Sequence, residues 1–346
     1  MKAIQLTALH QPLALIDLPD PTPGPGEVVV NLRAAALNHR DVFIQQGLYP
    51  GIILPSVPGS DGAGVVSAVG EGVDVAWLGR EVVINPGLQW GPNPAMNSPQ
   101  FKILGMPDAG TFAEKVVVPA SHVYGKPTYL TFEQAAALPL AGLTAWRALM
   151  SRAALKPNQT GQPERVLITG AGGGAALFAI QFAVAAGADV WVTAGSPEKL
   201  AKAVSLGAKG GVLYKEPDWH KTLLATVTNG DKALSKAGYF DVIIDSAAGP
   251  DFNKLTQVAA GGARIALFGG TTGKISDVLP AAIFFKQLNI FGTTMGNDAE
   301  FGAMLSFLET HQPVPVIDSV RPLAEAQAAY DRMNAGEQLG KLVLTI

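Results

Sequence analysis

The sequence contains no cysteine, and this absence excludes disulfide bonds, thiolate nucleophiles and every metal site that depends on sulfur ligands. No apolar run reaches the roughly 18 residues that a membrane helix needs, and the N-terminal MKAIQLTALH lacks the charged and apolar blocks of a signal peptide. A net charge of −3 leaves no electrostatic surplus for nucleic acid or an anionic membrane surface. We therefore expect a cytoplasmic protein that binds neither nucleic acid nor a membrane.

The length of 346 residues predicts about two domains at roughly 150 residues each. Over residues 1–122, short β-branched runs alternate with Gly and Pro, which favours a small, mostly antiparallel β domain. Residues 86–110 show little periodicity and are interpreted as a surface lobe or a lid. The final segment, 295–346, contains a helical pattern at 323–334 and a closing strand at 341–346, and we expect it to return to the first domain.

From residue 123 onward the pattern changes to a helical segment at 131–150, followed by short apolar strands that alternate with alanine-rich helices. This alternation predicts an α/β fold with a doubly wound parallel sheet, the Rossmann arrangement that binds dinucleotides, over residues 123–294. The expected strands are 165–169, 189–194, 211–214, 241–245, 264–268 and 289–293.

The first of these strands runs into a glycine-rich turn and then into an apolar helix. The turn has the pattern Gly170-x-Gly172-x-x-Ala175, with Gly173 and Gly174 inside it. Glycines are needed there because the backbone must approach a pyrophosphate closely, and the amides and dipole of the following helix then face its charge. Glycines also serve plain turns, but the strand before and the helix after favour a dinucleotide site.

The end of the second strand indicates which dinucleotide binds. NAD-binding proteins usually place a carboxylate there against the ribose 2′-hydroxyl, whereas this chain has Ser196 followed by Lys199. A hydroxyl and a cation suit a 2′-phosphate, so we expect NADPH as the cofactor. Alternatively, Ser196 caps the next helix and Lys199 is simply solvated, and the two interpretations are compatible.

Several segments together resemble a known family. The order of the segments AAALNHRD, PGSDGAGVVSAVGEGV and AAALPLAGLTAW, followed by the glycine turn, is similar to the medium-chain dehydrogenase/reductase family over nearly the whole chain. The resemblance is to its zinc-free quinone oxidoreductase and enoyl reductase branch in particular. It implies that the first third and the C-terminal tail form a GroES-like domain.

The same resemblance addresses the metal. Zinc-dependent members have a Cys where this chain has Asn38, a His-Glu pair where it has Ser60 and Asp61, and another ligand where it has Leu140. Their structural zinc lobe, with four Cys, would fall near residues 91–105, and this chain has no Cys. We therefore expect no metal. Alternatively, His39, Asp41 and Asp61 could form a metal site with oxygen and nitrogen ligands. The other interpretation of Asp41 and Asp61 is that their carboxylates hydrogen-bond loops of the β domain.

A reductase without zinc needs an acceptor that is already electron-poor, such as a quinone or a conjugated enone. The resemblance implies that Tyr49, in QQGLYP, is the catalytic proton donor, and that Asn38 hydrogen-bonds the acceptor or the nicotinamide ribose. Tyr49 could instead simply pack beside Pro50. Water is the alternative source of the proton.

The resemblance also implies further cofactor-binding positions. Thr144 and Thr293 would lie toward the nicotinamide, Tyr214 near the adenosine phosphate, and Lys341 at the phosphates. Gly269 and Gly270 follow a strand whose carboxyl end faces the ligand in such folds. Ordinary packing and turn formation are the alternatives for these residues.

Two rival functions share parts of this pattern. A non-catalytic, crystallin-like NADPH-binding protein would have the glycine turn but no working proton donor, and a zinc-type alcohol dehydrogenase would carry a metal. The oligomeric state is equally open: the apolar segments 283–285 and 288–291 fit either an interface in a homodimer, as in relatives that pair through the last strand of the cofactor sheet, or a buried core.

Overall fold

The computed structural model describes residues 1–158 and 161–346. The chain divides into two compact units, one formed by Met1–Leu143 with Gly296–Ile346 and the other by Thr144–Met295. The C-terminal segment thus belongs to the first unit. The boundary predicted at 122/123 is too early, because strand β9 (Val123–Gly125) pairs with β5 (Glu81–Ile84) of the first unit.

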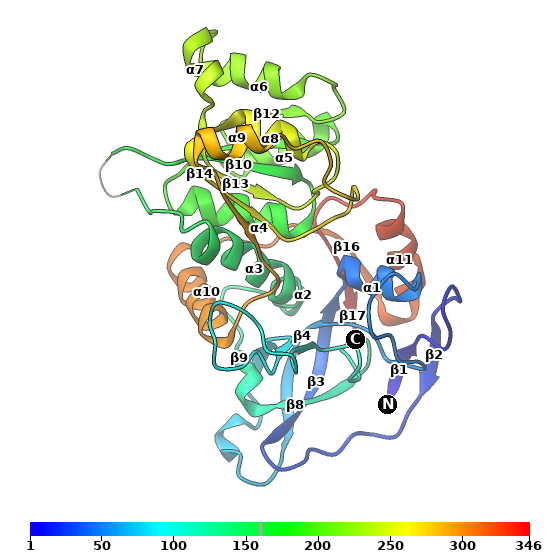
Figure 1. Cartoon of the computed structure of the whole chain (residues 1–346). Helices are drawn as coiled ribbons and strands as arrows, with labels where there is room; N and C mark the ends of the chain where they lie inside the picture. The colour runs from blue at the N-terminus through cyan, green and yellow to red at the C-terminus, as the bar shows by residue number, and fades with distance from the viewer. Residues whose placement is uncertain (159–160) are drawn as a thin grey trace. The chain divides into compact units, whose positions relative to one another are not determined.

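The second unit is built on a six-stranded sheet in which all paired strands are parallel (Figure 1). Their spatial order, β12-β11-β10-β13-β14-β15, reverses direction in the middle and is the predicted doubly wound order. Short apolar runs, such as residues 242–244 within Phe240–Asp245, form these strands because both faces of the sheet are covered. The strands are β10 (Arg165–Ala171), β11 (Asp189–Ala194), β12 (Gly210–Leu213), β13 (Phe240–Asp245), β14 (Ala259–Leu267) and β15 (Asn289–Gly292).

Helices pack on both faces of this sheet (Figure 1). Leu223 and Leu255, from two of these helices, share a buried core with Leu167, Ile243 and Ile265 of the strands. The helices are α4 (Gly174–Ala185), α5 (Pro197–Ser205), α6 (Trp219–Val227), α7 (Lys232–Ala237), α8 (Phe252–Val258) and α9 (Pro280–Lys286). The predicted helical segment 131–150 is not one helix, because it divides into α2 (Phe132–Ala136), α3 (Pro139–Trp146) and a π-helical turn (Arg147–Arg152).

The first unit has a seven-stranded sheet in the order β16-β17-β3-β4-β5-β9, with β8 also paired to β3. Its pairs are antiparallel except for β16 with β17. The strands not yet given are β1 (Lys2–Gln5), β2 (Ala14–Asp17), β3 (Glu27–Ala36), β4 (Asp61–Val69), β6 (Gly87–Leu88), β7 (Lys102–Ile103), β8 (Lys115–Pro119), β16 (Ile317–Pro322) and β17 (Lys341–Thr345), and the helices are α1 (His39–Gln45), α10 (Asp298–His311) and α11 (Ala326–Asn334).

The segment 86–110, predicted as a lobe or lid, is anchored at both ends of a short hairpin. Strands β6 and β7 pair, and Leu88 and Leu104 join the core of the first unit. The tip around residues 92–96 is exposed.

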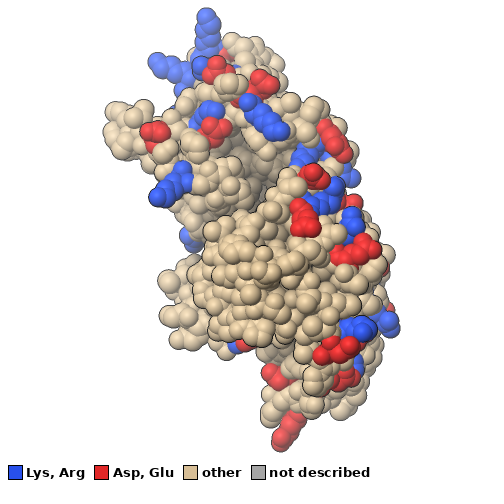
Figure 2. Space-filling model, turned by 90° about the vertical axis from the view of Figure 1, so that its right-hand side faces the viewer, with Lys and Arg blue, Asp and Glu red and all other residues tan. Residues whose placement is uncertain are grey.

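Figure 2 shows Lys and Arg interspersed with Asp and Glu on the face in view, with a broad uncharged area among them. None of the helices within residues 1–158 and 161–346 has the length and apolar character to cross a membrane.

Candidate active site

Three polar residues meet at one end of the first unit's sheet because of strand register. Strand β17 pairs with β3 so that Val343 lies opposite Ala36, and continuing this register brings Lys341 opposite Asn38. Strand β4 pairs with the other side of β3, with Asp61 opposite Ala36. Residues 38, 61 and 341 are distant in sequence, but they are therefore adjacent at one end of three neighbouring strands.

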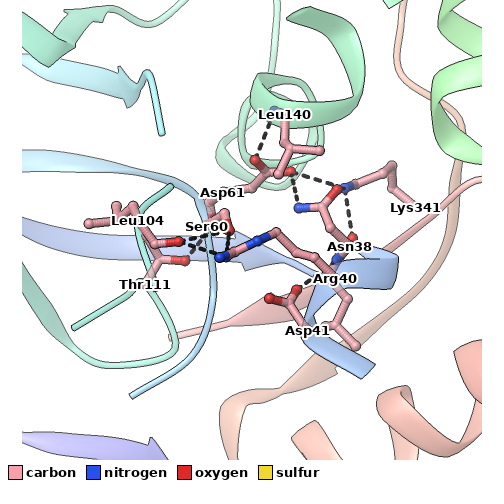
Figure 3. A network of polar contacts seen from close by, with 10 residues as sticks. Asn38, Arg40, Asp41, Ser60, Asp61, Leu104, Thr111, Leu140 and Lys341 are labelled. Atoms are coloured by element: carbon pink, nitrogen blue, oxygen red, sulfur yellow. Dashed lines mark hydrogen bonds and ion pairs between the residues drawn. The ribbon is translucent and has the colours of Figure 1, made fainter. Parts of the chain in front are cut away.

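These three side chains form a buried network (Figure 3). The Lys341 ammonium donates to Asp61 Oδ2 at 3.0 Å, to Asn38 Oδ1 at 2.7 Å and to the backbone oxygen of Leu37 at 2.7 Å. Asn38 Nδ2 donates to Asp61 Oδ2 at 2.9 Å. Asp61 Oδ1 accepts the backbone N–H of Leu140, in the first turn of α3, at 2.9 Å. Asp61 is 0% exposed and Lys341 4%, so the ion pair is shielded from water.

This geometry corrects the prediction that Lys341 faces the cofactor phosphates. An ammonium has three N–H donors, and all three are bonded within the first unit. The structure thus assigns Lys341 to the network around Asn38 and leaves it no donor for a phosphate. The prediction missed this partner because strand register, rather than spacing in the sequence, brings residue 341 to residue 38.

A second cation lies beside this network. Arg40 Nη1 donates to Ser60 Oγ at 2.6 Å and to the backbone oxygen of Leu104 at 2.9 Å. Its guanidinium carbon lies 4.9 Å from the ring centroid of Tyr49, and its Nε lies 3.4 Å from the Tyr49 hydroxyl oxygen. Ser60 bonds Arg40 and directly precedes Asp61, which bonds Asn38. The Arg40–Tyr49 contacts and the Asn38 network are therefore adjacent at residues 60 and 61.

The ionisable residues of α1 respond to burial. Asp41 is fully enclosed and accepts the backbone N–H of Asn38 at 2.8 Å. Burial raises the pKa of its carboxyl to about 6, although the Arg40 charge opposes this shift. Burial, together with the Lys341 charge, lowers the pKa of His39. Asp41 thus bonds the loop residue Asn38, as the interpretation of a loop-binding carboxylate expected. The Asp61 carboxylate bonds helix α3 and Lys341 instead, which that interpretation missed.

The donor set at the positions that match zinc ligands does not suit zinc. Asn38 offers a neutral amide, Leu140 offers no side-chain donor, and Ser60 offers a hydroxyl that already accepts from Arg40. The Lys341 and Arg40 cations, 2.7 and 2.6 Å from Asn38 Oδ1 and Ser60 Oγ, would repel a divalent ion. Within the described part of the chain, no three His, Cys, Asp or Glu side chains are grouped closely enough to hold a metal.

The glycine turn of the second unit connects β10 to α4. Gly170 has φ +67° and Gly172 has φ +132°, conformations that favour glycine. Gly173 is the N-cap of α4 and Gly174 is its first residue, so the N-cap residue has no side chain to bond the first amides of this helix. This arrangement suits a pyrophosphate, and it places the four predicted glycines at the turn and the helix start.

The residues expected to select the cofactor lie around this turn. A Cβ at Gly172 would lie 2.6 Å from Lys199 Cδ, so the Lys199 side chain passes directly over the turn. Ser196 Oγ accepts the backbone N–H of Lys199 at 3.3 Å and caps α5, as the alternative interpretation expected. The Tyr214 hydroxyl lies over Gly195, where a Cβ would approach it to 2.5 Å. Sequence reasoning missed Gly195, although its place after β11 was the available signal.

The carboxyl ends of the other strands carry the remaining predicted positions. Thr293, after β15, has a buried Oγ1 with no hydrogen-bond partner among the described residues, which suits a ligand contact. A Cβ at Gly269 would lie 2.2 Å from the backbone oxygen of Ser246, whereas Gly270 has open space around it. Thr144 is buried in α3.

One buried carboxylate at these strand ends escaped the sequence analysis. Asp245, at the end of β13, accepts the Thr169 hydroxyl at 2.6 Å and the backbone N–H of Ala248 at 2.8 Å. Burial raises the pKa of Asp245, and these hydrogen bonds oppose that shift. Asp245 thereby joins the carboxyl end of β10 to the loop after β13. A single Asp at the end of an apolar strand was its only sequence signal.

Comparisons with known proteins identify both units. The family described as "Alcohol dehydrogenase GroES-like domain" matches residues 24–128, and the one described as "Zinc-binding dehydrogenase" matches residues 174–310. The GroES-like domain implied by the sequence is thereby confirmed.

Relatives match the whole chain. The "Zinc-type alcohol dehydrogenase-like protein YogA" of Leptosphaeria maculans is 37% identical, over 98% of this chain and 96% of the relative. The human "Quinone oxidoreductase" is 27% identical, over 100% of this chain and 98% of that protein. A crystal structure titled "NAD-dependent alcohol dehydrogenase" superposes with a TM-score of 0.91 at 38% identity, over 100% of both chains.

Proposed function

The chain belongs to the medium-chain dehydrogenase/reductase family of nicotinamide-dependent oxidoreductases, and from that premise we propose that it is a metal-independent, NADPH-dependent reductase of quinones or α,β-unsaturated carbonyls. The observation that carries this proposal is the donor set around Asn38. Two cations and no sulfur ligand stand where zinc-dependent members of the family bind their metal.

An acceptor that is reduced without a metal must stabilise negative charge itself. A quinone or an enone does so, because hydride added at one end of the conjugated system places the negative charge on oxygen. When bound, the nicotinamide supplies that hydride. The remaining N–H of Asn38 would donate a hydrogen bond to the charged oxygen.

Tyr49 would complete the reduction by donating its proton. Its hydroxyl oxygen accepts from the Arg40 Nε at 3.4 Å, and this contact does not use the phenolic O–H, which can donate to another acceptor. A neighbouring cation also stabilises the negative charge that develops on the phenol oxygen as the proton leaves. These contacts favour Tyr49 over a bulk water as the proton source.

Support for NADPH comes from the surroundings of the glycine turn. Ser196, Lys199 and Tyr214 offer two hydroxyls and a cation near the end of β11, and that strand ends in Thr193 and Ala194, with no carboxylate at its carboxyl end. The crystal structure that superposes on this chain is titled as NAD-dependent, so both cofactors require direct comparison.

Calorimetric titration with NADPH and NADH tests the cofactor preference. Ser196→Asp keeps a side chain that can cap α5 but adds a negative charge, and we expect it to weaken NADPH binding at least tenfold while NADH binding is retained. Lys199→Met keeps the aliphatic stem over Gly172 and removes the charge, so it should also weaken only NADPH. Equal affinity of the wild type for both cofactors would contradict the phosphate assignment.

Steady-state oxidation of NADPH with a panel of quinones and enones tests the reaction. We expect turnover with members of at least one class. Tight NADPH binding with no oxidation by any acceptor would favour a non-catalytic NADPH-binding protein instead.

A zinc-type alcohol dehydrogenase is the second candidate, because a 37% identical relative carries that name. The Asn38 donor set argues against it. Metal content and alcohol oxidation, measured on one preparation, separate the two candidates.

The exposed end of the second unit supports a further proposal, that two copies pair through β15. Among the described strands, β15 has only β14 as a neighbour, and Phe284 and Phe285 of α9 are 59% and 80% exposed. Leu288 is buried, so only part of the apolar segment is core. Light scattering should give a dimer mass for the wild type and a monomer mass for Phe285→Glu, and a monomeric wild type would contradict this pairing.

A further inference from the structure

The carboxamide of Asn38 is held by two opposite charges. Its oxygen accepts from the Lys341 ammonium at 2.7 Å, and its nitrogen donates to the Asp61 carboxylate at 2.9 Å (Figure 3). The reversed orientation would set the NH₂ group against an ammonium and the oxygen against a carboxylate. Both contacts would then be repulsive, so the charges alone determine which way the amide faces.

Counting donors shows what this arrangement leaves available. The carboxamide has two N–H groups, and Asp61 takes one of them. Lys341 has no N–H left, since Leu37, Asn38 and Asp61 accept all three. The second N–H of Asn38 is therefore the donor that this network leaves for a ligand. Asn38 is 7% exposed, so this N–H lies in a largely dehydrated environment.

The two charged residues are themselves anchored to the fold. Asp61 Oδ1 accepts the backbone N–H of Leu140, and the Asp61 backbone oxygen accepts the Thr111 hydroxyl at 2.8 Å. Lys341 begins β17 and also bonds the backbone oxygen of Leu37, directly after β3. The positions of both charges thus depend on the backbone of three strands and one helix, which makes their spacing rigid.

We propose that Lys341 and Asp61 are positioning residues that fix the Asn38 carboxamide and present its second N–H to the negatively charged oxygen of the reduced acceptor. The ammonium at the amide oxygen also draws electron density from the amide, which makes the N–H a stronger donor. In this way the Lys341 ammonium polarises the acceptor indirectly, through the Asn38 amide. This inference rests on the proposed function.

Lys341→Met tests the proposal, because it removes the charge and keeps a side chain of similar length. Lys286→Met is the matched control, since the Lys286 ammonium also donates three hydrogen bonds, to the backbone oxygens of Thr256, Gln257 and Ala259, but belongs to the second unit and not to the Asn38 network. Because Lys341→Met leaves Asp61 buried and unpaired, the double variant Lys341→Met/Asp61→Asn removes both charges and guards against simple unfolding.

Two measurements are made on each variant. The first is the NMR signal pair of the Asn38 side-chain NH₂ in protein labelled with ¹⁵N-asparagine, assigned by its loss in Asn38→Ala. The second is the set of kinetic constants kcat, KM for the acceptor and KM for NADPH. The NMR measurement needs no turnover. It therefore tests whether Lys341 orients the Asn38 carboxamide even if the chain is not a reductase.

We expect one resolved NH₂ pair in the wild type and in Lys286→Met, and a shifted or broadened pair in Lys341→Met and in the double variant. We expect kcat to fall on the order of 100-fold in both Lys341 variants, with the KM for NADPH within about twofold, as for the loss of an oxyanion donor. Unchanged Asn38 signals in Lys341→Met would overturn the proposal that Lys341 orients the Asn38 carboxamide. Recovery of kcat in the double variant would show that Lys341 only stabilises the fold and would equally overturn it.

Discussion

The glycine turn of the second unit and the Asn38 network of the first unit are built in opposite ways. The turn consists of one short stretch, 170–174, in which four of the five residues are glycines without a side chain. The network uses charged side chains from residues 38, 61 and 341, which only strand register brings together. The first site is therefore sensitive to added atoms, and the second to removed or unbalanced charge.

Among these substitutions, we expect Gly172→Ala to have the largest effect, the loss of NADPH binding at the glycine turn. Gly172 has φ +132°, and an added Cβ would lie 2.6 Å from Lys199 Cδ, so the turn must move. We expect calorimetry to detect no NADPH binding. The Asn38 NH₂ signals should be unchanged, because they belong to the other unit.

Gly261→Ala is the control for this substitution, because its Cβ would meet only the backbone oxygen of Lys286, at 3.9 Å, an ordinary contact. It should bind NADPH like the wild type. NADPH binding by Gly172→Ala with wild-type affinity would disprove the assignment of this turn to the pyrophosphate.

Tyr49→Phe sharpens the comparison by removing one oxygen atom from the side-chain site. We expect kcat for enones to fall tenfold to a hundredfold, as for the loss of a general acid, while NADPH affinity is retained. Tyr129→Phe is the matched control, because its hydroxyl bonds the backbone oxygen of Pro313 elsewhere in the first unit. An unchanged kcat in Tyr49→Phe would indicate that water, not Tyr49, donates the proton.

Asp41→Asn measures how the buried Asp41 carboxylate, beside the Asn38 network, changes the free energy of unfolding. The pKa of Asp41 is raised from 3.8 to about 6 by burial, so the folded state binds a proton between pH 4 and 6 that the unfolded state releases. The contribution of Asp41 to stability is therefore largest below pH 4 and is lost as the pH rises through 6.

The expected result is a difference in pH dependence between two proteins. Relative to Asp41→Asn, the free energy of unfolding of the wild type should rise as the pH falls from 7 to 4, by at most about 1.4 kcal/mol per pH unit. Chemical denaturation at several pH values measures it. Parallel pH profiles for the two proteins would contradict the raised pKa.

Features encoded by contiguous residues were predictable from the sequence. The apolar run in β13 and the glycine pattern after β10 correctly predicted a doubly wound sheet with its dinucleotide turn. The boundaries were less accurate: β14 begins at Ala259 rather than at 264, and residues 123–143 belong to the first unit. In both cases tertiary pairing, rather than local periodicity, decides where an element or a unit ends.

Features that depend on pairing over long distances were not predictable. Nothing near residue 341 indicates that its ammonium will contact Asp61, since the contact requires β17 and β4 to lie on opposite sides of β3. The contact of Arg40 with Tyr49 similarly depends on the path of the loop after α1. Resemblance identified Asn38 and Tyr49 as candidates, but the charges that orient them came from the structure alone.

We propose that the first unit has fixed charges of its own where zinc-dependent members of the family hold a metal. Oxidation of NADPH by a quinone or an enone, measured on protein dialysed exhaustively against a strong chelator and analysed for zinc in the same sample, tests it most directly. We expect full turnover with far less than one zinc per chain. Stoichiometric zinc, with activity that disappears when the zinc is removed and returns when it is restored, would contradict it.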